Sequence, residues 1–131
     1  MFFTDRKLEA RLYELASYRY RDIIPFESLF AKEDTAGVSN PEIPTSDACW
    51  DLMAVGERWS GRDRYLWLRK TMSVPKAWEG KKIVGIFDFG STGGGNNSGF
   101  ESMLYIEGKP YQGVDSNHNE AFFDSNYAGK D

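Results

Sequence analysis

The segment 115–120 holds the densest run of side chains that could do chemistry, and it reads Asp-Ser-Asn-His-Asn-Glu. Alternating oxygen ligands of this kind begin calcium-binding loops. An EF-hand also needs Gly at its sixth position and Glu at its twelfth, and this chain has Glu120 and Asn126 there, so that site is excluded. Another kind of cation contact stays open. Asp115 and Glu120 do not by themselves define a glycosidase pair, because that chemistry depends on their separation in space.

The chain contains one His, His118, and one Cys, Cys49. These two residues cannot supply the ligands of a zinc site built from two or three His side chains. Cys49 has no second Cys for a disulfide, and its neighbours Ala48 and Trp50 predict a small buried side chain. We therefore expect no metal site and no complete active site in this chain.

Residues 90–99 form a stretch of low complexity, Gly-Ser-Thr-Gly-Gly-Gly-Asn-Asn-Ser-Gly. A phosphate-binding loop needs a Lys after its last Gly, and a dinucleotide-binding loop needs a helix after it. This stretch has no Lys and precedes the strand-like segment 100–106. It predicts a flexible loop between strands and no nucleotide site.

Aromatic side chains are abundant, with 4 Trp, 7 Tyr and 9 Phe. A sugar site needs an exposed flat ring beside amide, carboxylate or imidazole groups, because the apolar face of the sugar stacks on the ring while its hydroxyls form hydrogen bonds. Trp59 and Trp78 are the Trp residues that lie in such polar settings, so they are the candidates. Packing in the core or on a sheet face is the alternative for both.

Helical periodicity occurs in residues 5–20, where Leu8, Leu12 and Leu15 share one face. The narrow apolar stripe predicts a surface helix that docks by this face, either on its own domain or on a part of the protein outside this chain. Residues 21–44 place several Pro and Gly residues between scattered apolar ones, so we expect an irregular connecting arm.

A period of two replaces the helical one after Pro44. Turn signals separate the predicted strands and no helix lies between them, which favours an antiparallel β-sandwich or jelly roll. The strand over 82–89 has few polar positions and is expected at the centre of its sheet. We expect a helix and arm over 1–44 and a β-sandwich over 45–131. The predicted strands are 50–55, 65–72, 82–89, 99–106 and 121–123.

Charge and hydropathy exclude two classes of partner. With 16 Lys and Arg against 20 Asp and Glu, the net charge is −4, and no basic run is present to neutralise nucleic-acid phosphates. No apolar run reaches the ~18 residues of a membrane span, and the charged N-terminus lacks the apolar core of a signal peptide. The sequence predicts a soluble cytoplasmic protein without nucleic-acid or membrane partners.

Several short motifs occur in a defined order along most of the chain. They are Trp-Leu-Arg-Lys at 67–70, Val-Pro-Lys-Ala-Trp-Glu-Gly-Lys at 74–81, Phe-Asp-Phe-Gly at 87–90, the hairpin-like segment 104–115 and Asn-His-Asn-Glu at 117–120. In this order they resemble the N-terminal domain of family 38 glycoside hydrolases, the α-mannosidases of the bacterial and fungal cytosolic or vacuolar type. The glycine-rich residues 93–98 have no counterpart in that pattern.

The resemblance implies a fold and a place in a larger enzyme. The fold is a galactose-binding-like jelly roll, led by one α-helix and an irregular arm, and it precedes a zinc-dependent catalytic barrel. The parent enzyme is expected to hydrolyse α-mannosides with retention, through a carboxylate nucleophile and a second carboxylate as acid/base. Zinc and the catalytic residues are expected in the barrel, after Asp131, so no catalytic residue is assigned in this chain. The implied compartment is the cytoplasm, or the vacuole in a fungus.

As a non-catalytic lead domain, the chain is expected to dock on and support the barrel of the same polypeptide. The loop 115–120 is expected to reach the rim of the sugar pocket and contact a mannose-containing oligosaccharide. The residues expected to dock are Leu8, Leu12, Leu15, Phe26 and Phe30, and those expected to bind sugar or line the rim are Asp115, Asn117, His118, Asn119 and Trp59.

Two other classes of function stay open. One is a self-sufficient carbohydrate-binding module that uses Trp59 or Trp78, and the other is a protein-interaction β-sandwich with a large exposed apolar patch. The sequence stops at a turn after the strand 121–123, where the family sandwich continues. We expect a strand to be missing and a sheet edge to stand open, which favours a dimer through that edge.

Overall fold

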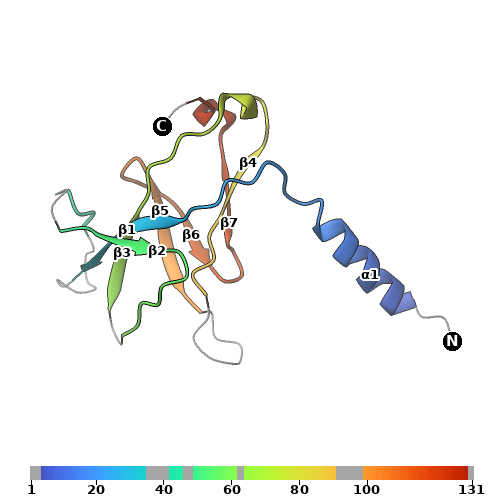
Figure 1. Ribbon diagram of the computed structural model, residues 1–131, viewed down its shortest axis with the longest axis horizontal. Coiled ribbons are helices and arrows are strands. Elements are labelled where there is room, and N and C mark those ends of the chain that lie inside the picture. Colours follow the sequence, from blue (N-terminus) through green and yellow to red (C-terminus); the bar gives the residue numbers. More distant parts are fainter. Residues whose placement is uncertain (1–3, 35–41, 46–48, 62–63, 91–98, 130–131) are drawn as a thin grey trace.

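The fold is mainly β with one N-terminal helix, as the sequence predicts. Figure 1 shows the computed structural model, which describes residues 4–34, 42–45, 49–61, 64–90 and 99–129. The elements are α1 (Thr4–Ala16), β1 (Ser28–Asp34), β2 (Asp51–Ala54), β3 (Tyr65–Arg69), the 3-10 helix η1 (Lys76–Trp78), β4 (Ile83–Ile86), β5 (Glu101–Ile106), β6 (Lys109–Asp115), β7 (Glu120–Phe123) and the 3-10 helix η2 (Ser125–Tyr127). In these residues the strands pair antiparallel in three small sheets, ordered β2-β1-β3, β4-β7 and β5-β6.

The β5–β6 hairpin shows how the sequence sets local structure. Ile106 pairs with Lys109, which leaves Glu107 and Gly108 as a two-residue turn. Both turn residues have positive φ, 51° and 76°, as a type I′ turn requires. Gly108 adopts this conformation without strain, and the turn matches the right-handed twist of the strands. This turn therefore fixes the register of the hairpin.

Small aliphatic side chains form the core, and aromatic rings join the sheets. Trp67 of β3 contacts Tyr105 of β5, with ring centroids 5.7 Å apart. Tyr111 of β6 stacks on Phe123 of β7 at 5.8 Å. Each contact links two different sheets, so these rings pack at the seams of the sandwich. The buried apolar residues, one each from β1, β4, β6 and β7, are Ala31, Ile83, Val114 and Ala121.

Strand β7 forms hydrogen bonds along both of its edges. One edge pairs with β4. On the other edge, the side-chain amide of Gln112 donates to the carbonyl of Glu120 at 2.9 Å, and the Tyr111 hydroxyl donates to the carbonyl of Phe122. Carbonyls two residues apart in a strand point to the same side. Two side chains of β6 therefore cover the edge of β7 that backbone pairing leaves open.

Helix α1 projects away from the β body (Figure 1), and none of its residues is buried. It ends at Ala16, so the predicted end at residue 20 is wrong. The amides of Tyr18 and Arg19 bond to carbonyls only three residues back, at 3.0 and 3.2 Å. The Ser17 hydroxyl donates to the Glu14 carbonyl at 2.7 Å. These shorter-range bonds tighten the backbone and end the α-helix.

Two strands were not among those predicted. Residues 28–34, placed in an irregular arm, form β1, the middle strand of its sheet. Ala31 is 7% exposed, since β2 and β3 flank it. Residues 109–115, recognised as part of a hairpin and not counted as a strand, form β6. The arm is therefore irregular only outside β1, while the domain boundary at residue 44 stays a prediction.

Two further predictions differ from the structure. Strand β4 was expected at the centre of a sheet, but among the described residues it pairs with β7 alone, and Ile86 is 45% exposed. Cys49 was expected to be buried, but it is exposed and has φ of 65° at a turn, so its side chain does not join the core. The glycine-rich loop falls mostly on residues 91–98, which lie outside the described residues. No helix in the described segments is long and apolar enough to cross a membrane.

Candidate functional site

The predicted polar residues 115–120 lie on one short loop, between the last residue of β6 and the first of β7. Asp115 organises this loop. Its Oδ1 accepts hydrogen bonds from the backbone amides of Asn117 at 2.7 Å and His118 at 2.8 Å. Both of its carboxylate oxygens lie 3.1 Å from Nδ1 of His118. One carboxylate therefore closes the turn and orients the imidazole.

These contacts set the electrostatics of the loop. The hydrogen bond from the His118 side chain, followed by that from the Asn117 backbone amide, lowers the pKa of Asp115 below its ordinary value. Asp115 is therefore ionised at neutral pH. The His118 side chain is 76% exposed, so most of its ring faces solvent. The loop presents an imidazole and the exposed Asn117 amide on a fixed backbone.

Glu120 has a different role in the same loop. Its carboxylate forms an ion pair with Arg19 at 2.7 Å and accepts a hydrogen bond from the Tyr20 hydroxyl. The side chain is 19% exposed, whereas that of Arg19 is 63% exposed. The pair joins the segment after α1 to the start of β7, so Glu120 acts as an anchor. The sequence did not predict the roles of Arg19 and Tyr20, because about a hundred residues separate them from Glu120 and no local pattern marks the contact.

The backbone of Asn119 is hydrogen-bonded to the residue that follows β4. Its carbonyl accepts a hydrogen bond from the Phe87 amide at 2.8 Å. Trp59 does not join this loop. It is 39% exposed and lies in the link between β2 and β3, which lies apart from the β6–β7 loop in Figure 1. The structure thus brings together the four residues predicted between 115 and 119 but leaves Trp59 elsewhere.

The residues predicted to dock form two separate surfaces. Leu8, Leu12 and Leu15 on α1 are 62%, 61% and 63% exposed, and they form the helix stripe. Phe30 lines a groove on the β body, which we call the arm groove, and Phe26 lies next to Lys70 of that groove. The two surfaces lie on different parts of the molecule, because α1 projects away from β1 (Figure 1).

The arm groove has a volume of about 340 Å³ and is lined by Phe30, Arg69, Lys70 and Thr71. Phe30 pairs across the sheet with Arg69, and its side chain is 45% exposed. The Lys70 ammonium lies 6.0 Å from the centroid of the Phe26 ring, at the outer limit of a cation–π contact. Cationic and aromatic groups therefore share this groove.

A comparison with protein families decides where this chain belongs. The family model described as the jelly roll domain of alpha-mannosidase matches residues 29–130, well over half of the chain. The chain belongs to this family. The match supports the resemblance to the N-terminal domain of family 38 α-mannosidases. No curated protein and no solved structure matches the chain.

The jelly roll domain of alpha-mannosidase accounts for part of the site. The match begins at the second residue of β1 and includes all of the strands that follow it, so β1 is part of the jelly roll. It covers the β6–β7 loop and the arm-groove residue Phe30. Helix α1 lies before the matched range, so the helix stripe is outside the residues that the family model covers.

Proposed function

We propose that this jelly roll domain is a non-catalytic lead domain that docks on the catalytic barrel of an α-mannosidase and supports it. The observation that carries the proposal is the helix stripe. Leu8, Leu12 and Leu15 stand on one face of a helix that contacts none of the described strands closely enough to bury a residue. Burying one Leu side chain contributes about 1.5–3 kcal/mol, so three of them supply a sizeable docking energy.

The arm groove supports the same role through a second contact. Phe30 offers apolar surface, and Arg69 and Lys70 offer positive charge beside it. Interfaces commonly combine an aromatic residue with Arg in this way. Two surfaces on separate parts of the molecule would hold the domain in one orientation on the barrel, whereas one surface alone would leave it free to pivot.

The hydrolytic chemistry is assigned to the barrel. Among the described residues, no group of three His, Cys, Asp or Glu side chains could hold a metal ion, and the chain's one His and one Cys do not fit a zinc site. Zinc and the two carboxylates of a retaining mechanism are therefore proposed for the barrel. The proposed compartment is the cytoplasm, or the vacuole in a fungus.

The docking proposal is tested in the full-length enzyme by Leu12→Glu, with Ala10→Glu as the matched control on the opposite face of α1. Both variants place an exposed Glu on the same helix, so they differ only in the face they alter. We expect Leu12→Glu to lower the thermal stability of the enzyme and to make the segment after α1 more sensitive to protease. Equal behaviour of the two variants would contradict docking through the helix stripe.

A second role concerns the β6–β7 loop, which we propose lies at the rim of the sugar pocket. The exposed groups of Asn117 and His118 can donate to or accept from hydroxyls while Asp115 holds the backbone. In the full-length enzyme, His118→Ala is expected to raise KM for a mannoside severalfold with little change in kcat, because the contact is made in both ground and transition states. Unchanged KM would contradict the rim role without affecting the docking proposal.

A further inference from the structure

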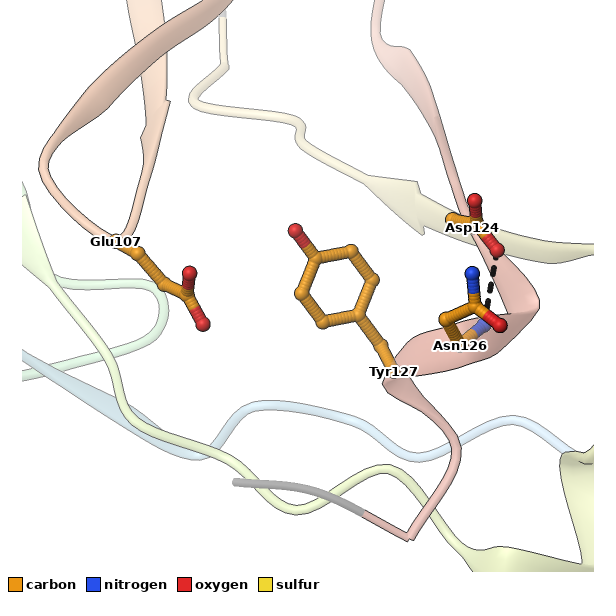
Figure 2. A pocket seen from close by; sticks show the side chains of 4 residues that line it. All are labelled: Glu107, Asp124, Asn126 and Tyr127. Carbon is orange, nitrogen blue, oxygen red and sulfur yellow. Dashed lines mark hydrogen bonds between the residues drawn. The ribbon is translucent and has the colours of Figure 1, made fainter.

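A second polar pocket, which shares no lining residue with either docking surface, lies between the β5–β6 turn and η2 (Figure 2). It has a volume of about 290 Å³, near the lower limit of small-molecule pockets. Its lining residues are Glu107, Asp124, Asn126 and Tyr127. They come from two segments of the chain, so the fold assembles this pocket.

The backbone fixes the residues on the η2 side. Oδ1 of Asp124 accepts a hydrogen bond from the Asn126 amide at 2.9 Å and thereby caps η2. Just after Tyr127, the amide of Gly129 donates to the Val74 carbonyl at 2.7 Å. Tyr127 therefore stands between two anchored points. The backbone at Tyr127 therefore loses little conformational entropy when a ligand binds.

The side chains of the pocket leave several polar groups available. Within the described residues, no hydrogen bond or ion pair engages the carboxylate of Glu107, the side-chain amide of Asn126 or the hydroxyl of Tyr127. Figure 2 shows the Tyr127 ring between Glu107 on one side and Asp124 with Asn126 on the other. A half-buried ring thus has hydrogen-bonding groups on two sides.

The arrangement distinguishes between classes of ligand. A metal ion needs its oxygen ligands gathered around one point, and here the ring separates the two carboxylates. An anion is disfavoured because Glu107 and Asp124 are the charged residues that line the pocket. An organic cation could pair with the carboxylates, but it would leave the donors of the Asn126 amide and the Tyr127 hydroxyl unused. Sugar hydroxyls both donate and accept, and the apolar face of a sugar stacks on an aromatic ring.

We propose that this pocket binds a single neutral pyranose residue of a glycan, with Tyr127 as the stacking platform and Glu107, Asp124 and Asn126 as hydrogen-bonding groups. The site is independent of docking, since it uses neither the helix stripe nor the arm groove. The domain then carries its own sugar-binding site in addition to its contacts with the barrel.

The test is a titration of the 131-residue chain with methyl α-mannoside and, separately, methyl α-galactoside, followed by amide NMR shifts. We expect saturable shifts at residues 107 and 124–127 in the millimolar range with at least one of the two sugars. Tyr127→Ala should weaken binding about tenfold, and Tyr127→Phe, which keeps the ring, only about threefold. Tyr18→Ala, at an exposed Tyr outside the pocket, is the matched control and should bind normally.

Glu107→Ala removes the acceptor, with the exposed Glu57→Ala as its control. Loss of binding in the first variant and not in the second is expected. A third titration uses N-acetyl-arginine amide as a cationic probe. Shifts with this probe and none with either sugar would overturn the proposal and identify a site for a basic side chain. Silence with all three probes, or sugar-induced shifts around Trp59, would overturn it too. None of these outcomes bears on docking, which the Leu12→Glu variant tests.

Discussion

Helix α1 and strand β7 differ in how far their apolar residues are buried. The helix has thirteen residues, none of them buried, whereas the four-residue β7 contains Ala121, which is 0% exposed. Strand β7 bonds to β4 on one edge and to β6 side chains on the other. The comparison separates stability from the proposed docking: β7 packs within the jelly roll, whereas the apolar side chains of α1 stay exposed.

The largest expected effect follows from enlarging Ala121. It pairs with Gly85, and a Cβ built on that glycine would lie 2.7 Å from the Phe123 ring, so space on this side of the sheet is tightly filled. Ala121→Leu should lower the free energy of unfolding by about 1–3 kcal/mol, because the added atoms force neighbouring rings to move. Chemical denaturation measures this. Ala10→Leu, on the exposed helix, is the control and should change stability by less than about 0.5 kcal/mol. Equal effects would remove the contrast between the two elements.

A smaller effect is expected when the side-chain cover of β7 is removed. Tyr111→Phe deletes the hydroxyl that donates to the Phe122 carbonyl and keeps the ring that stacks on Phe123. We expect a loss of about 1 kcal/mol, typical of one hydrogen bond. Tyr13→Phe is the control, since Tyr13 is 85% exposed on α1. If both variants denature alike, the hydroxyl does not stabilise the edge.

The ion pair that joins the segment after α1 to the start of β7 should contribute less to the free energy of unfolding. Glu120→Gln weakens the ion pair with Arg19, and a partly exposed pair of this kind contributes about 0.2–1 kcal/mol. The loss should shrink in 1 M salt, where the Debye length falls to about 3 Å. Denaturation at low and high salt measures it, with Glu9→Gln as the exposed control. A loss that does not depend on salt would show that the ion pair is not its source.

The β6–β7 loop should respond to acid. In the folded protein the pKa of Asp115 lies below its ordinary value. Its contribution to the stability of the fold is therefore complete above the ordinary pKa of about 3.9, and it is lost as the pH falls through the lowered folded value. Amide NMR shifts of Asn117 and His118 should report the loss as one transition below about pH 4. Asp115→Asn should remove that transition. The same transition in the variant would assign it to another group.

The smallest effect is expected for Leu12→Glu in the 131-residue chain alone. Leu12 is 61% exposed and packs on nothing buried, so the denaturation midpoint should stay unchanged within error. In the full-length enzyme the same substitution should matter. A destabilised isolated chain would mean that α1 already packs on the jelly roll.

The sequence predicted most of the strands and the polar loop, because both are local patterns. Asp115 and His118 are three residues apart, so one turn brings them together. Strand β1 was missed because Lys32 and two acidic residues follow Ala31, and this breaks the apolar alternation that marks strands. The contact of Tyr20 with Glu120 depends on the whole fold. The Tyr127 pocket was missed for the same reason, since its two segments meet only after folding.

The side-chain cover on β7 also has a consequence for association. A strand edge that accepts hydrogen bonds from Tyr111 and Gln112 offers fewer free carbonyls to another chain. A second copy could add its strand there only after displacing both side chains. Two side chains therefore cover this edge, and a variant or a partly unfolded chain that lacks this cover would expose the carbonyls of Glu120 and Phe122 as a template for pairing with another chain.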